Sequence, residues 1–178
     1  MFADLVKNRR SIREYEDRPV EPAKIDTIIE SALRAPSGRA IRPWSFVVVT
    51  DKDILEKLSV AKPMGADFLK SAPVHIVVCV ETDESNVWIE DSAIAAVFMQ
   101  LCAHSLGLGS RWSHMRGNMY DDNMTTRDYI AEILGLPDNL EVECIIAIGY
   151  PAESVPPYKK EELRFDKVGY NGYGKKRK

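Results

Sequence analysis

The chain has 178 residues, of which 45% are hydrophobic and 29% charged, and its formal net charge is −3. This length fits one domain that can bury a core without disulfides. The slight negative charge argues against a protein that binds nucleic acid through a strong positive field. We therefore expect one domain over residues 1–178, with any functional positive charge concentrated locally.

The three cysteines, Cys79, Cys102 and Cys144, lie far apart in the sequence and in apolar surroundings. Their odd number and wide spacing indicate buried, reduced thiols in a cytoplasmic protein, and neither a disulfide framework nor a metal site. The first residues, 1–4, form an amphipathic turn without the apolar run of a signal peptide.

Two helices are predicted before residue 36. Phe2, Leu5 and Val6 have the spacing of one face of a short helix. A second helix begins at Pro22, because proline is tolerated in a first helical turn. It ends near Ala35, because the following proline disfavours helical geometry in the residue before it.

Two unbroken apolar runs, at 46–50 and 75–80, predict buried strands, with a short helix at 51–59 between them. The longest predicted helix covers residues 86–106, and it is apolar or small almost all round. We expect that helix to be central and nearly enclosed. Its apolar run is shorter than the roughly 20 residues that a membrane span needs.

The polar stretch 111–123 is predicted to be a loop, followed by a helix that ends at Gly135 and a strand at 142–148. Residues 151–178 show no helical or strand period. We expect them to form an extended C-terminal arm whose spaced aromatic residues pack on another surface, such as a second subunit.

Residues 9–13, Arg-Arg-Ser-Ile-Arg, place three guanidinium groups and a hydroxyl close together. Arginine offers a rigid fork of donors and keeps its charge, so this group suits an anion with planar oxygens. The alternative is an ordinary solvated charge run. A second loop, 35–44, adds two arginines and Trp44, and its Gly38 permits a close backbone approach. Together the two segments favour an anionic, partly aromatic ligand.

The common catalytic patterns are missing from the sequence. No histidine has a partner at the spacing of zinc ligands, and there is no G-x-S-x-G elbow or Walker loop. His75 and His104 are interpreted as structural, whereas His114, in the predicted loop, is a candidate to line a site. We therefore predict no catalytic side chain and no metal, and a bound cofactor that carries the reaction.

Four motifs in this order resemble the nitroreductase family of FMN-dependent oxidoreductases. They are RRSIR at 9–13, APSG-x4-PW at 35–44, GLGS-x-W at 107–112 and IGYP at 148–151. The resemblance implies an α+β fold: a three-layer α/β/α sandwich with a mostly antiparallel central sheet. It also implies an intertwined homodimer with FMN at the subunit interface.

The resemblance assigns roles to particular residues. The cofactor-binding residues it implies are Arg9, Arg10, Ser11 and Arg13 at the phosphate and flavin, Pro36, Ser37 and Gly38 against the ring from the partner subunit, Trp112, Ser113 and His114 beside the ring, and Lys160 at the phosphate, with Lys159 and Arg164 as alternatives.

The chain departs from the family pattern in the second motif. Many members carry Asn and Gln four and two residues before the tryptophan, where this chain has Ala40 and Arg42. The missing amides leave substrate preference open. Arg42 could bring positive charge toward an anionic substrate and is the substrate-binding candidate.

The activity that the resemblance implies is reduction of electron-poor acceptors, such as nitroaromatics or quinones, by NAD(P)H through a ping-pong mechanism. Three alternatives stay open: a flavin-dependent dehydrogenase or dehalogenase, a flavin-binding protein with little turnover, and a nucleotide-binding module without flavin. The expected partners are a second copy of the chain and a small-molecule acceptor, without nucleic acid or membrane.

Overall fold

The computed structural model describes residues 1–177, and its centre is a four-stranded sheet in the order β1-β2-β4-β3. The strands are β1 (Trp44–Val49), β2 (Val74–Glu81), β3 (Gly109–His114) and β4 (Leu140–Gly149). All three strand pairs are antiparallel. The central strands β2 and β4 are buried along most of their length, because both faces of the sheet are covered. The expected antiparallel sheet is confirmed.

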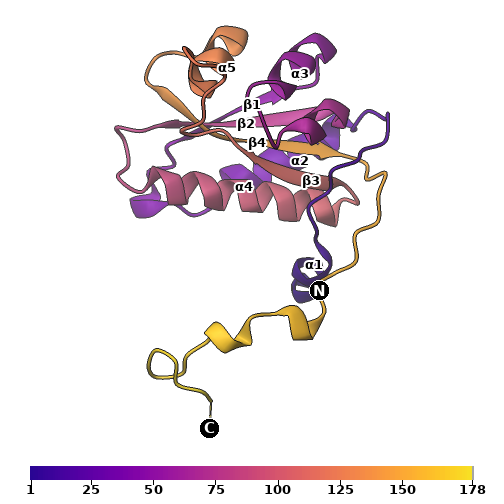
Figure 1. Cartoon of the computed structure of the whole chain (residues 1–178), viewed down its shortest axis with the longest axis vertical. Helices are drawn as coiled ribbons and strands as arrows, with labels where there is room; N and C mark the ends of the chain where they lie inside the picture. Colours follow the sequence, from indigo (N-terminus) through magenta and orange to yellow (C-terminus); the bar gives the residue numbers. More distant parts are fainter. Residues whose placement is uncertain (178) are drawn as a thin grey trace.

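Helices lie on both faces of the sheet and make three layers, with α2 and α4 on one face and α3 and α5 on the other (Figure 1). The helices are α1 (Phe2–Asn8), α2 (Pro22–Leu33), α3 (Lys52–Ser59), α4 (Trp88–Ser105) and α5 (Thr126–Leu134). Neighbouring residues of β2 point to opposite faces of the sheet. Ile76 packs with α2 and α4, whereas Val77 packs with α3 and α5. The predicted α/β/α sandwich is confirmed.

Local sequence signals set the helix ends. The Asp51 carboxylate accepts hydrogen bonds from two backbone N–H groups at the start of α3, and the Thr125 hydroxyl accepts one from the Asp128 N–H at the start of α5. Gly107 and Gly135 follow the ends of α4 and α5 with φ of 77° and 67°, a left-handed conformation that favours glycine. The predicted helix end at Gly135 is therefore confirmed.

The prediction of a loop over residues 111–123 is wrong in its first part. Residues 111–114 belong to β3, which pairs with β4 from Gly109 opposite Gly149 to His114 opposite Cys144. An edge strand needs only one ladder of hydrogen bonds and leaves side chains in solvent, so its sequence can be polar. For this reason the polar composition did not indicate a strand. Trp112, Ser113 and His114 lie on β3 and not in a loop.

The expectation that α4 is nearly enclosed does not hold for the single chain. One side of α4 is buried, but Ile94, Val97 and Phe98 are 38%, 48% and 37% exposed. Their spacing of three and four residues places them on one side of the helix. An apolar stripe of this kind is stable in water only when another surface covers it.

The amino-terminal helix and the C-terminal arm extend together from one end of the sandwich (Figure 1). The Arg10 guanidinium donates to the Pro156 carbonyl and lies 4.0 Å from the centre of the Tyr158 ring. Residues 152–177 contain only two short 3₁₀ turns, Lys160–Glu162 and Phe165–Lys167. Within residues 1–177, no helix is both long enough and apolar enough to cross a bilayer.

We predict that His75 makes the fold sensitive to mild acid. The ring is fully buried in β2, and its Nε2–H donates to the Leu69 carbonyl at 2.9 Å. Burial lowers the pKa of His75 from 6.5 to about 4, with the Leu69 hydrogen bond opposing that shift. The unfolded chain therefore binds a proton at pH values where the folded chain does not. Stability from this group is complete above pH 6.5 and is lost as the pH falls toward 4.

The expected loss from this residue is about 2 kcal/mol of unfolding free energy between pH 7 and pH 5. Urea unfolding of the wild type and of His75→Gln at both pH values measures it. The glutamine can keep the hydrogen bond to Leu69 but does not titrate. An equal loss of stability in both proteins would contradict the assignment.

Candidate functional site

The Arg-Arg-Ser-Ile-Arg segment runs beside the start of β3. Ser11 forms a parallel bridge with Ser110, and the Ile12 backbone N–H donates to the Ser110 carbonyl at 3.1 Å. Gly109 permits this approach, because a Cβ built on it would lie 2.7 Å from the Ile12 Cγ1 atom. The segment is thus fixed by backbone contacts, and its arginines flank the edge of the sheet.

A hollow of about 370 Å³ opens beside this segment. Its lining residues are Arg13, Glu14, Gly65, Asp67, Phe68 and Arg111. The Arg111 guanidinium lies 4.3 Å from the centre of the Phe68 ring. Burial and then the charge of Arg13 lower the pKa of Arg111, which places the two guanidinium groups in each other's field. An anion bound between them would relieve that repulsion.

Lys62 brings further positive charge to the same edge. Its ammonium group donates to the His114 carbonyl at 3.0 Å, and burial followed by the charge of Arg111 lowers its pKa. Sequence reasoning missed Lys62 and Arg111 as site residues, because they lie about 50 positions apart in segments interpreted as a turn and a loop. Only the fold brings them together beside residues 9–13.

The Pro-Ser-Gly loop packs on the first turn of α4. The Gly38 backbone N–H donates to the Asp91 carboxylate at 2.7 Å, and the Arg42 N–H donates to the Ser37 hydroxyl at 2.9 Å. A Cβ on Gly38 would lie 2.7 Å from the Val87 Cγ2 atom. The expected close approach at Gly38 is confirmed.

The same loop holds three residues other than glycine in left-handed conformations. Arg39, Ala40 and Arg42 have φ of 52°, 57° and 57°. Such conformations are uncommon without glycine and persist where surrounding contacts fix them. Arg42 and Pro36 are exposed at this turn, so the loop presents them outward.

The two predicted binding segments lie at opposite ends of α4. Gly38 bonds to Asp91 in the first turn, whereas burial and then the charge of Arg9 lower the pKa of His104 in the last turn. At about 1.5 Å per residue, the helix between Asp91 and His104 is about 20 Å long. One chain therefore does not bring these segments together.

The residues predicted beside the ring differ in their surroundings. Trp112 packs in the core formed with α2 and α4, whereas the His114 side chain is 44% exposed. Ser113 is buried, and its hydroxyl has no hydrogen-bond partner within residues 1–177. Buried polar atoms are normally hydrogen-bonded, so this hydroxyl is a candidate contact for a ligand.

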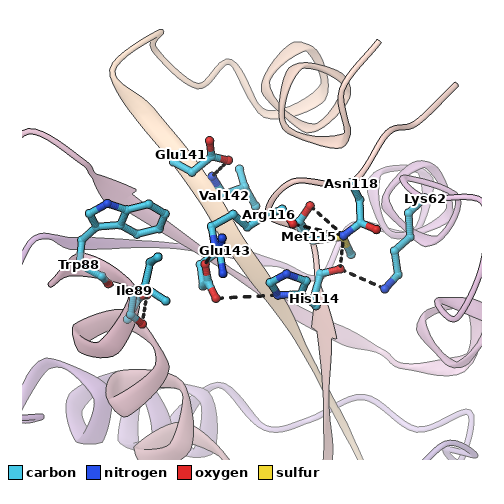
Figure 2. Close-up of polar contacts among 11 residues, drawn as sticks. Lys62, Trp88, Ile89, His114, Met115, Arg116, Asn118, Glu141, Val142 and Glu143 are labelled. Atoms are coloured by element: carbon cyan, nitrogen blue, oxygen red, sulfur yellow. Dashed lines mark hydrogen bonds and ion pairs between the residues drawn. The ribbon is translucent and has the colours of Figure 1, made fainter. Parts of the chain in front are cut away.

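Figure 2 shows a polar cluster at the end of β3 that sequence reasoning also missed. Arg116 Nε donates to the buried Glu143 carboxylate at 2.7 Å, and His114 Nδ1 lies 3.8 Å from the other carboxylate oxygen. Glu143 stands in β4 two residues after Glu141, and a glutamate at this place in the sequence carries no recognisable motif.

The predicted phosphate-binding lysine lies in the arm. Lys160 is exposed in the first 3₁₀ turn. Of its alternatives, Arg164 makes two hydrogen bonds to the Asp166 carboxylate, at 2.8 and 2.6 Å, while the Lys159 backbone N–H donates to Glu162. The single chain does not bring Lys160 to residues 9–13 through any contact of the described residues.

Two of the three cysteines are buried thiols with raised pKa values. Cys79 and Cys144 are buried as expected, and burial raises the pKa of Cys79 to about 12 and that of Cys144 well above its usual value. Cys102 is half-buried, with its sulfur 3.6 Å from the Thr27 carbonyl. In the described part of the chain, no cluster of three or more His, Cys, Asp or Glu residues is arranged to hold a metal.

The chain matches the model of the nitroreductase family over residues 6–62 and 59–150. An FMN-dependent nitroreductase from Clostridium difficile R20291 has a TM-score of 0.92 and 46% identity, over 95% of this chain and 98% of that one.

Two relatives in sequence have related names. A protein of Methanothermobacter thermautotrophicus, whose name joins NADH dehydrogenase with NAD(P)H nitroreductase, is 37% identical over 154 residues, 85% of this chain and 78% of its own length. An FMN reductase [NAD(P)H] of Bacillus subtilis is 27% identical, over 82% of this chain and 64% of its own.

We predict that Gly38→Ala destabilises the loop on α4. The added methyl group would overlap Val87, and overpacking of this kind costs about 1–3 kcal/mol. Thermal unfolding measures the loss. Arg39→Ala in the same loop is the control, because Arg39 makes only a 3.5 Å contact with Asn86. A midpoint for Gly38→Ala equal to that of the control would show that the approach is not tight.

Proposed function

Since this chain belongs to the nitroreductase family, we propose that it is an FMN-dependent oxidoreductase that uses NAD(P)H to reduce electron-poor acceptors. The observation that carries the proposal is that Arg13 and Arg111 line one hollow beside the edge of β3, with Lys62 near enough to Arg111 for that charge to lower its pKa. Nitroaromatics and quinones are the acceptor classes we propose.

The residues at this edge fit FMN by their chemistry. The guanidinium forks of Arg9 and Arg13 suit a phosphate dianion, and the hydroxyl of Ser11 can add a donor. Arg111 lies over an aromatic ring beside the hollow, and the unpartnered Ser113 hydroxyl offers a polar contact. This combination of positive charge, flat surface and a spare hydroxyl supports a phosphorylated planar ligand.

When bound, FMN supplies the redox chemistry, because it can accept a hydride equivalent from NAD(P)H and give two electrons to an acceptor. The side chains bind and orient the reactants. Positive charge from Arg13, Arg111 and Lys62 favours any species that gains negative charge at this edge. No side chain has to act as a nucleophile or as a covalent intermediate.

We propose further that the working unit is a homodimer. The exposed stripe Ile94, Val97 and Phe98 of α4 would pack on the same stripe of a second copy, since twofold interfaces are self-complementary. If the twofold axis crosses α4, the two helices run antiparallel. The first turn of one α4, with residues 36–38, then lies near the last turn of the other, with residues 9–13.

The C-terminal arm fits the same proposal. Tyr158, Phe165, Tyr170 and Tyr173 are all more than a third exposed in the single chain, and α1 has no buried residue. Exposed aromatic groups of this kind can pack on another surface. We propose that residues 151–177 pack on the partner and bring Lys160 to its phosphate site. The three free thiols support a reducing, cytoplasmic location.

Arg42 is the proposed contact of the loop with substrate. It is exposed at the turn that would face the partner's flavin, and it stands where many family members have an amide. Arg42 gives this loop a positive charge where those members have an uncharged amide, and a positive charge favours anionic acceptors. A low-turnover flavin carrier, in contrast, would keep its flavin colour after NAD(P)H is added under argon.

Arg13→Ala is expected to weaken FMN binding about tenfold to a hundredfold, the range for one hydrogen bond to a charged group. Quenching of FMN fluorescence by the protein freed of flavin measures the affinity. Arg18→Ala is the matched control, because Arg18 pairs with Glu21 and lies over Tyr150. Unchanged flavin affinity in Arg13→Ala would remove this residue from the site.

Steady-state kinetics are expected to be ping-pong, because donor and acceptor would use the same pocket in turn. Initial rates at several fixed acceptor concentrations should give parallel double-reciprocal lines against NAD(P)H. Intersecting lines would show that both reactants bind together, and the single-pocket proposal would then be wrong.

A further inference from the structure

Strand β4 carries one extra residue opposite β2. Adjacent residues of β2 pair with Val142 and Cys144, so that Glu143 has no partner across the strands. Its carbonyl accepts hydrogen bonds from the backbone N–H groups of Met115 and Arg116, at 3.0 and 3.2 Å. A bulge of this kind redirects the side chain of the extra residue and ends regular pairing. Glu143 is therefore aimed at the turn that follows β3.

The redirected carboxylate is almost completely buried. Glu143 is 3% exposed, and its Oε2 atom accepts from Arg116 Nε at 2.7 Å. His114 Nδ1 lies 3.8 Å from the other oxygen, Oε1 (Figure 2). A buried carboxylate is tolerated only when cations or donors surround it. The pairing thus fixes the Arg116 side chain at a defined position.

Most donors of Arg116 remain available. Only Nε bonds to Glu143, and within residues 1–177 its two terminal nitrogens make no hydrogen bond. The side chain is 36% exposed, and its guanidinium lies 5.8 Å from the centre of the Trp88 ring in the first turn of α4. Arginine–carboxylate pairs frequently make two parallel hydrogen bonds, and Arg116 makes only one to Glu143.

A guanidinium fixed in position beside an indole face suits a flat anion. The guanidinium binds the negative charge, and the indole packs against the ring. The cluster adjoins His114, which we placed beside the flavin. We propose that Arg116 is a specificity-determining residue that binds the carboxylate of an aromatic electron acceptor, with Trp88 against its ring. Glu143 is then a positioning residue that acts through Arg116. This inference rests on the proposed function and adds the substrate class to it.

The reduction itself is balanced without any further reagent. A nitro group becomes a nitroso group by taking up two electrons and two protons, and one water molecule leaves. NAD(P)H provides the electron pair with one proton, as hydride through the flavin, and solvent provides the second proton. Arg116 binds the carboxylate and transfers no proton in this step.

The binding test uses two probes of nearly equal shape that differ in charge, benzoate and benzamide, neither of which is reduced. Their dissociation constants for the oxidised holoenzyme are measured from the change in flavin absorbance. Wild type should bind benzoate about tenfold tighter or more, the value of one charge-assisted hydrogen bond. Arg116→Gln should abolish this preference. Arg18→Gln, which removes a comparable pair with Glu21 and Tyr150, should retain it.

A second measurement compares turnover of 4-nitrobenzoate and 4-nitrobenzamide. In Arg116→Gln, the KM for the anion should rise about tenfold or more while that for the amide stays near wild type. If this variant does not fold, Arg116→Lys replaces it. Lysine keeps the positive charge, but its single ammonium group cannot bond Glu143 and also offer a pair of donors to the ligand. The preference for the anionic compound should therefore fall.

Two results overturn the inference. One is a wild-type protein that reduces both nitro compounds but shows no preference for the anionic probe. The other is a preference that persists in the folded Arg116 variants. A wild-type protein that binds no FMN overturns the proposed function as well, so the two failures are distinguishable.

Discussion

The length of α4 is the constraint on which the rest of the account depends. Its first turn anchors the Pro-Ser-Gly loop through the Gly38–Asp91 hydrogen bond, and its last turn lies beside Arg9. The helix is rigid and separates these segments by about 20 Å. A ligand that contacts both must therefore lie between two copies. The apolar stripe on the exposed side of the same helix supplies a surface on which those copies could meet.

Much of the fold could be predicted because its core elements have strong apolar signals. Strands β2 and β4 are mostly apolar, α3 and α5 begin at capping residues, and α2 begins with a proline. Strand β3 was missed because an edge strand needs no apolar run. Because β3 was not predicted, Arg111 was not recognised as a site residue. Its position beside Arg13 depends on the pairing of β3 with β4.

The candidate site was predictable where its residues are adjacent in sequence, and not where the fold assembles them. Residues 9–13 and 36–38 form compact motifs. Lys62, Arg116 and Glu143 instead come from three separate segments and meet only at the end of β3 (Figure 2). The bulge at Glu143 depends on the register between β2 and β4, which the apolar pattern of β4 does not reveal.

The most direct test of a two-chain site uses mixed dimers of two defective variants. One chain carries Arg13→Ala and the other Gly38→Val, each with a different affinity tag, and the mixed species is purified through both tags. If each site takes residues 9–13 from one chain and 36–38 from the other, the mixed dimer regains one intact site. The account predicts that one site of the mixed dimer binds FMN with wild-type affinity, whereas every site of either parent dimer binds it more weakly. Mixed dimers in which no site binds FMN more tightly than the sites of the parents would contradict it.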